Sequence, residues 1–192
     1  GSQIVAELAT PTVSTNIVDF CAGAGGKSPS IAANMPDGCT IDAWDIRRRA
    51  LHETNRRTKR AGFDSLISTT EISTTGPLPK ERADWVLVDA PCSGTGTLRR
   101  HVLSRWRGDD NPLEALVPMQ LSILNRAAAI VSDGGTLIYA TCSVLKAEND
   151  SVVEAFLREN RGWKLQGHTK TSPANEGCDG LFAAKLTKTY GA

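Results

Sequence analysis

The sequence has no apolar run near the roughly 20 residues that cross a bilayer, which excludes a membrane-spanning helix of ordinary length. Residues 1–5 lack the basic start and long apolar stretch of a signal peptide, so we expect none. The five cysteines form no CxxC pair and the three histidines are scattered, so we expect neither a disulfide framework nor a metal site. These absences predict a cytoplasmic protein with reduced thiols.

A strong charge of either sign is missing as well. Lysine and arginine number 22 against 21 acidic residues, so the net charge of +1 argues neither for nor against a nucleic-acid partner. The 192 residues are 40% hydrophobic and 22% charged. This balance is typical of a globular protein and excludes a disordered tail, a collagen-like fibre and a coiled coil. The length fits one domain.

Short apolar segments alternate with helical patterns along the whole chain. Residues 85–88, Trp-Val-Leu-Val, predict a buried strand, and 148–160 predict an amphipathic helix. By the same criteria we expect strands at 17–19, 40–44, 66–69, 136–140, 163–165 and 181–186, and helices at 28–35, 47–61 and 118–131, the last closed by 133–135. The alternation predicts an α/β fold: a doubly wound, mostly parallel sheet with helices on both faces.

A glycine-rich turn follows the first expected strand. Gly23, Gly25 and Gly26 would let a ligand approach the backbone closely, although a simple tight turn is the alternative. A dinucleotide fingerprint would require glycine at position 28, where the chain has serine. Asp45 ends the second strand, where a carboxylate suits ribose hydroxyls or caps the next helix. Together these features indicate an adenosine-containing ligand, either a dinucleotide or S-adenosylmethionine.

Two cysteines follow strands of the expected sheet. Cys92 comes shortly after Asp89, and Cys142 comes directly after the strand at 136–140. Because the carboxyl ends of parallel strands meet at one edge of a sheet, we expect both thiols in one cleft. Either cysteine alone would ordinarily be a core residue. The two together, each beside small polar residues, favour a shared chemical function.

These segments resemble the RsmB/Sun family of RNA (cytosine-5) methyltransferases over nearly the whole chain. The paired segments DAPCSGTG at 89–96 and TCS at 141–143 are highly specific for it. Further matches are CAGAGGK at 21–27, Gln120, Glu148-Asn149 and DGLF at 179–182.

The chain departs from the family pattern at two places. The usual loop contains Ala-Pro-Gly-Gly where this sequence has Gly-Ala-Gly-Gly at 23–26. The acidic residue expected after the third strand corresponds to either Asp64 or Glu71. Family members also carry an N-terminal RNA-binding extension, so we expect residues 1–192 to be one S-adenosylmethionine-dependent catalytic domain, a fragment without that extension.

The resemblance implies a class I, Rossmann-like fold, S-adenosylmethionine as cofactor and RNA as partner. It implies that Cys142 is the nucleophile that adds to C6 of cytosine, and that Cys92 assists loss of the C5 proton and release of the product. Asp89 would hold the edge of the base and stabilise a protonated N3. The residues expected at the cofactor are Cys21, Ala22, Gly23, Ala24, Gly25, Gly26, Lys27, Asp45 and Asp89. Any further role of Lys27 stays open.

Basic residues crowd two segments of the chain. For the helix at 47–60, RNA contact and a plain solvated face are equally expected. For Arg99 and Arg100, which follow the Cys92 motif, we expect contact with RNA phosphates. The resemblance implies ribosomal RNA as substrate, with transfer RNA second. The rival hypotheses are a non-catalytic RNA-binding or assembly module with the same fold and a nicotinamide-dependent oxidoreductase. No apolar surface stripe demands a dimer, so we expect a monomer.

Overall fold

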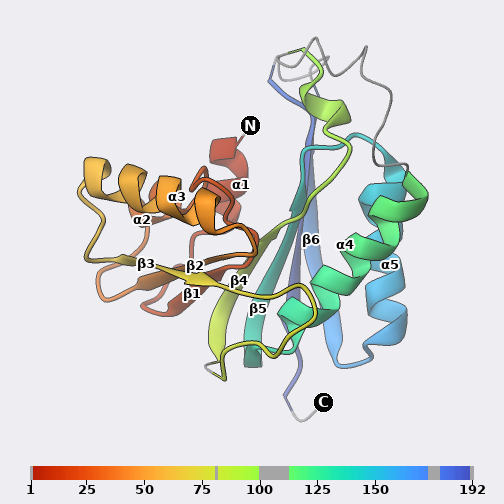
Figure 1. The fold of residues 1–192 in the computed structure, drawn as a ribbon. Helices are drawn as coiled ribbons and strands as arrows, with labels where there is room; N and C mark the ends of the chain where they lie inside the picture. The colour runs from red at the N-terminus through yellow and green to blue at the C-terminus, as the bar shows by residue number, and fades with distance from the viewer. Residues whose placement is uncertain (1, 81, 100–112, 173–177, 191–192) are drawn as a thin grey trace.

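The computed structural model describes residues 2–80, 82–99, 113–172 and 178–190. Its centre is a seven-stranded sheet with the strand order β3-β2-β1-β4-β5-β7-β6 (Figure 1). The strands are β1 (Asn16–Asp19), β2 (Thr40–Asp45), β3 (Ile67–Glu71), β4 (Ala83–Asp89), β5 (Val131–Thr141), β6 (Trp163–Thr171) and β7 (Leu181–Lys188). The helices are α1 (Ser2–Leu8), α2 (Ser28–Ala32), α3 (Arg48–Ala61), α4 (Leu113–Ala128) and α5 (Asp150–Glu159), with short 3₁₀ turns η1 (Thr95–Thr97) and η3 (Lys146–Glu148).

The first five strands are parallel, and β7 pairs antiparallel with both β5 and β6. This arrangement confirms the mostly parallel, doubly wound sheet. The strand order reverses between β1 and β4, which are hydrogen-bonded neighbours. Ligands of such sheets bind beyond the carboxyl ends of the strands at this point, so the residues after β1, β2, β4 and β5 are the first place to look for a site.

Helices cover both faces of the sheet, and each face has its own apolar core. Helices α1 and α2 pack on one face, where Val5 and Ile31 meet Ile17 and Leu87. Helices α4 and α5 pack on the other face, in a cluster that includes Leu124, Phe156, Val86, Val88 and Tyr139. Neighbouring residues of 85–88 in β4 and of 137–140 in β5 belong to opposite cores, which explains why these two runs are apolar without interruption.

The boundaries differ from the expected ones at the second half of the sheet. The expected helix at 118–131 begins earlier, at Leu113, and ends at Ala128, with Pro118 inside it. Residues 133–135 do not close that helix and lie within β5 instead. Gly134 has a φ of 77°, and the pairing register shifts beside Ala83, so this stretch is an irregular start to a strand. Helix α1 was not expected, because its seven residues carry too short a periodic pattern.

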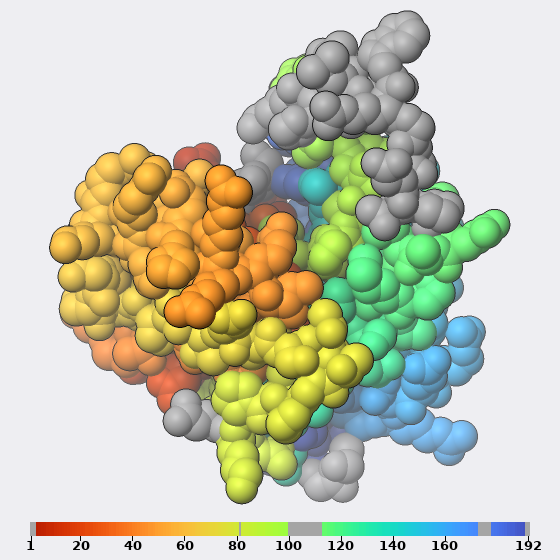
Figure 2. Space-filling model, in the orientation of Figure 1, coloured from red at the N-terminus to blue at the C-terminus, as the bar shows by residue number. Residues whose placement is uncertain are grey.

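Figure 2 shows a recess in this view, between the orange segment that contains α3 and the light green segment that follows β4. Within the described ranges, no helix combines the length and the apolar character needed to cross a membrane.

Candidate active site at the carboxyl ends of the strands

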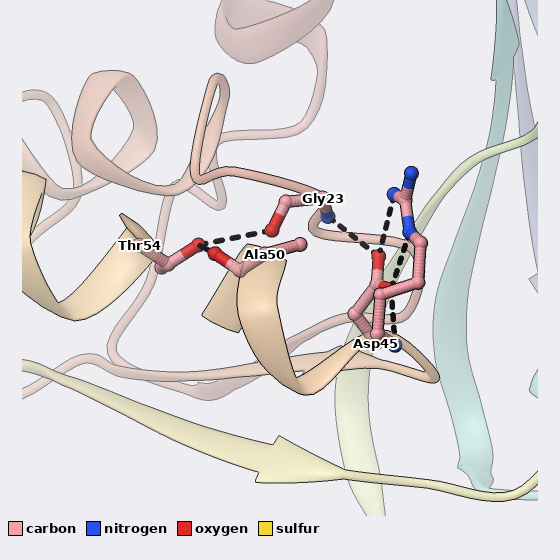
Figure 3. A network of polar contacts seen from close by, with 5 residues as sticks. Gly23, Asp45, Ala50 and Thr54 are labelled. Carbon is pink, nitrogen blue, oxygen red and sulfur yellow. Dashed lines mark hydrogen bonds and ion pairs between the residues drawn. The ribbon is translucent and has the colours of Figure 1, made fainter. Parts of the chain in front are cut away.

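The turn after β1 is closed by backbone geometry that requires glycine. Gly23 and Gly25 have φ angles of 58° and 72°, a region that other residues rarely adopt. A Cβ on Gly25 would lie 2.9 Å from a methyl carbon of Thr54, so this position also lacks space. Thr54 of α3 donates a hydrogen bond to the Gly23 carbonyl at 3.0 Å (Figure 3). Gly26 differs, because a Cβ there would meet nothing within 4 Å.

Asp45 at the end of β2 is bonded to this turn. Its Oδ2 accepts a hydrogen bond from the Gly23 amide at 2.8 Å, and its Oδ1 accepts from the Arg47 amide at 2.8 Å (Figure 3). The Arg47 guanidinium also contacts both oxygens, at 3.0 and 3.2 Å. Burial raises the pKa of Asp45, but the bonds from Arg47 and Gly23 outweigh it and hold this pKa below its usual value. Asp45 thus bonds to the residue just before α3 and to no amide of that helix, whose residues are all described, and its carboxylate is ionised and oriented along the turn.

A groove of about 490 Å³ lies beside Asp45, lined by Ile46, Glu71, Ile72, Ser73 and Thr74. Glu71 pairs in register with Asp45 at the ends of neighbouring strands. Ile46 adds an apolar surface that is 50% exposed. Asp64 lies in the turn before β3, at the opposite end of that strand. Of the two acidic candidates, the structure thus brings Glu71 to the site and leaves Asp64 away from it.

Asp19, at the end of β1, lies at the candidate site and was not among the residues expected there. It is buried, and its Oδ2 accepts a hydrogen bond at 2.6 Å from Ser28, the first residue of α2. Its Oδ1 has no hydrogen-bond partner among the described residues. Burial, above all, raises the pKa of Asp19 to about 6. The available signal was position, because Asp19 ends a strand as Asp45 and Asp89 do.

The structure brings the two strand-end cysteines together, as the sequence predicts. The Sγ atoms of Cys92 and Cys142 lie 3.2 Å apart, and the Cys142 amide donates to the Cys92 sulfur at 3.3 Å. Both residues are half-buried. The hydrogen bond from Cys92 lowers the pKa of the Cys142 thiol despite its burial. The same contact, together with burial, raises the pKa of Cys92. Cys142 is therefore the thiol that ionises first.

An ion pair stands beside these thiols. Lys27, just before α2, contacts the Asp89 carboxylate at the end of β4. The side chain of Lys27 is only 13% exposed and that of Asp89 is 34% exposed. The Asp89 charge raises the pKa of Cys142 and the Lys27 charge lowers it, so both charges act on this thiol. Lys27, whose role the sequence left open, is thus the partner of Asp89 in this ion pair.

Gly96 and Gly180 lie in two of the motifs noted in the sequence, and their backbones are in direct contact. The Gly96 amide donates to the Cys142 carbonyl at 3.0 Å, and the Gly180 amide donates to the Gly96 carbonyl at 2.9 Å. A Cβ on Gly96 would lie 1.9 Å from the Gly180 carbonyl oxygen. Any side chain at this position would therefore separate the segment after Cys92 from the start of β7.

The remaining predicted residues lie less centrally. The half-buried Cys21 packs against the core, and burial raises the pKa of its thiol. Arg99 forms an ion pair with Asp179 at 3.8 Å, whereas Arg100 lies outside the described residues. On α3, Arg56 and Arg57 pair with Glu53, as on an ordinary solvated face. In the described part of the chain, no group of three or more His, Cys, Asp or Glu side chains could hold a metal ion.

Comparison with known proteins identifies the family that the chain resembles. The family model of the 16S rRNA methyltransferase RsmB/F matches residues 6–187. The probable ribosomal RNA small subunit methyltransferase B of Synechocystis sp. is 36% identical over 177 residues, which are 91% of this chain and 40% of the relative. Its Bacillus subtilis counterpart is 30% identical over 206 residues, 97% of this chain and 46% of the relative. The chain thus spans less than half the length of these relatives.

Solved structures share the fold. The crystal structure of NSun6 from Pyrococcus horikoshii with SFG superposes with a TM-score of 0.86 at 26% identity. The superposition covers 97% of this chain and 51% of that one.

Proposed function

Because this chain belongs to the 16S rRNA methyltransferase RsmB/F family of S-adenosylmethionine-dependent enzymes, we propose that it methylates C5 of a cytosine in RNA. The observation that carries this proposal is the contact between Cys92 and Cys142, whose Sγ atoms are 3.2 Å apart beside the Lys27–Asp89 ion pair. A non-catalytic RNA-binding module would need neither thiol.

The names of the relatives support ribosomal RNA of the small subunit as the substrate. Transfer RNA is the second candidate. The chain spans 40% of one relative and 46% of another, so more than half of each relative lies outside the match. That additional length would be available for RNA docking.

The residues at the turn and the groove fit S-adenosylmethionine. Asp45 would accept hydrogen bonds from the ribose hydroxyls once Arg47, whose side chain is 66% exposed, turns into solvent. The groove between Ile46 and Glu71 offers an apolar wall and an acceptor for the adenine. The open space at Gly26 leaves room for the rest of the molecule against the turn. When bound, the cofactor supplies an electrophilic sulfonium methyl group.

The cysteines would divide the reaction on the base between them. The Cys142 thiolate adds to C6, forming an Sγ–C6 bond, and C5 gains the electron density needed to accept a methyl group. Cys92, which keeps its thiol proton while Cys142 is ionised, would first release that proton to solvent, and its thiolate, the stronger base of the two, would then take the C5 proton while the electron pair of the Sγ–C6 bond returns to Cys142. Loss of that proton breaks the Sγ–C6 bond and restores the aromatic ring. Asp89, held by Lys27, would bind the edge of the base.

Arg99 is proposed to contact RNA phosphates outside this cleft. If it does, Arg99→Ala weakens binding across RNA sequences and lowers the slope of log affinity against log salt by about 1. An unchanged slope would remove this assignment.

The test of the proposed function is a denaturing-gel assay for a protein–RNA adduct, with unmodified small-subunit RNA and S-adenosylmethionine. Cys92→Ala should accumulate a covalent band, because the adduct forms but its release is impaired. Cys92→Ala/Cys142→Ala should show no band. A band that requires Cys92 instead would reverse the two roles. Absence of any band from a cofactor-binding protein, even on a chain extended at its N-terminus, would favour the non-catalytic module.

A further inference from the structure

A buried carboxylate outside the reacting groups joins the two cysteine loops. Glu148 ends η3 and is fully buried. Its Oε1 accepts hydrogen bonds from the Ser93 amide at 2.8 Å and from Gln120 Nε2 at 3.0 Å. Its Oε2 accepts from the Ser93 hydroxyl at 2.6 Å and from the Ser143 hydroxyl. Four donors from three separate segments thus converge on one side chain.

The positions of these donors relate Glu148 to the thiols. Ser93 directly follows Cys92, and Ser143 directly follows Cys142. Gln120, on α4, also donates at 2.9 Å to the backbone carbonyl that precedes Cys92. Glu148 therefore links the two loops through the residue after each cysteine, with a brace from α4, and it adds to the direct bond from the Gly96 amide to the Cys142 carbonyl.

Glu148 is ionised in this environment. Burial raises its pKa, but the hydrogen bonds from Ser143, Ser93 and Gln120 outweigh that effect and hold the pKa below its usual value. Removing the side chain would deprive the Ser93 amide and the Gln120 amide of their buried carboxylate acceptor, an unfavourable state that movement of the loops would relieve.

We propose that Glu148 is a positioning residue, which keeps the Sγ atoms of Cys92 and Cys142 in contact by bonding to the residue after each of them. The inference rests on the proposed function in that two thiols act on one base, although the positioning itself requires no RNA. A misplacement of reacting groups by about 1 Å can cost about 100-fold in rate.

The chemistry of the donors predicts which substitutions are tolerated. The donors to Oε1 are N–H groups, which cannot accept, whereas both donors to Oε2 are hydroxyls, which can. In Glu148→Gln, the amide oxygen can take the Oε1 place and the amide nitrogen can donate to the two serines. Glu148→Gln should therefore keep the loops together, and Glu148→Ala should not.

The test measures thiol proximity without RNA or cofactor. Diamide, a diazene oxidant that takes up the two thiol hydrogens, converts adjacent thiols into a disulfide. Trypsin places Cys92 and Cys142 in separate peptides, 83–99 and 127–146, each with one cysteine, so mass spectrometry follows their cross-link directly. Glu154→Ala is the matched control, since Glu154 is an exposed carboxylate on α5.

Glu148→Ala should slow formation of the 83–99/127–146 cross-link by about tenfold or more, with affinity for S-adenosylhomocysteine unchanged. Glu148→Gln and Glu154→Ala should stay near the wild-type rate. A wild-type rate in Glu148→Ala would overturn the proposal. A rate in Glu148→Gln as low as in Glu148→Ala would overturn the claim that hydrogen-bond geometry, rather than charge, holds the loops.

Ser143→Ala tests the same proposal if Glu148→Ala does not fold. Ser143→Ala removes one donor and should slow the cross-link several-fold, and an unchanged rate there would count against the proposal. Methyl transfer is then measured on the same variants. If the cross-link depends on Glu148 but methyl transfer is absent from the wild type, even on a chain extended at its N-terminus, the proposed function is refuted and the positioning role remains intact.

Discussion

Cys92 and Cys142 are separated by 50 positions in the sequence, yet their sulfur atoms are in hydrogen-bonding contact. The contact shifts the two pKa values in opposite directions, lowering that of Cys142 and raising that of Cys92. When the pair is singly ionised, one proton is held between the two thiols. Two residues of the same type thereby acquire different roles, with Cys142 as the nucleophile and Cys92 as the more basic group.

Replacing Cys92 should therefore make Cys142 less reactive toward alkylation. In Cys92→Ala the hydrogen bond that lowers the pKa of Cys142 is gone, so its thiolate appears only at higher pH. The rate of iodoacetamide labelling of peptide 127–146 should fall at neutral pH, and its pH profile should move upward. The half-buried Cys178, in peptide 171–185, serves as an internal reference. Coincident pH profiles for wild type and variant would contradict the assignment.

The buried Asp19 should make the free protein less stable as pH rises. Its pKa is raised from 3.8 to about 6 in the folded state, so the folded protein binds the extra proton and loses stability between these values. Above pH 6, this difference in pKa lowers the free energy of unfolding by about 3 kcal/mol. Asp19→Asn should raise the free energy of unfolding at pH 7.5, and this gain should shrink by about 1 kcal/mol at pH 5.

Urea titrations of both proteins at the two pH values measure that gain. Asp84→Asn, at an exposed carboxylate of β4, is the control. A gain from Asp19→Asn that is equal at pH 5 and pH 7.5 would refute the raised pKa.

Two adjacent glycines should respond differently to alanine. Gly25→Ala places a Cβ against Thr54 at a positive φ, so it should lower the free energy of unfolding by about 1–3 kcal/mol. Gly26→Ala meets no atom of the protein, so stability should be unchanged. Its Cβ instead enters the space assigned to the cofactor and should weaken S-adenosylhomocysteine binding about tenfold. Calorimetric titration with unfolding curves decides both, and tight binding by Gly26→Ala would exclude that space as the cofactor site.

Glu71 and Asp64 provide a matched pair of carboxylates at the two ends of one strand. Glu71→Gln should weaken cofactor binding about tenfold, because a charged acceptor at the groove is lost. Asp64→Asn removes the same charge far from the groove and should leave the affinity unchanged. Equal losses from both substitutions would point to a general charge effect.

The strand ends could be predicted from the sequence because each follows a short apolar segment, although Asp42 interrupts the one before Asp45. That pattern gave Asp45, Asp89 and both cysteines the right edge of the sheet. It could not choose between Asp64 and Glu71, since the choice depends on the pairing of Asp45 with Glu71 across two strands.

Other features depend on contacts that no local pattern encodes. Glu148 matched a motif, but its burial among donors from three segments becomes visible only when α4 and η3 are packed together. The start of β5 was misjudged because the helical periodicity runs on to Val131, while Gly134 and the register shift beside Ala83 mark an irregular strand. Sheet pairing overrides the local helical signal there.

The reversal of strand order between β1 and β4 divides the site into two working halves. The half before β4 supplies the turn and the groove, and the half from β4 onward supplies both thiols. Substitutions in the first half should thus register as changes in cofactor dissociation constant, and those in the second as changes in turnover. The Lys27–Asp89 ion pair bridges the two halves, so either of its members should alter both quantities together.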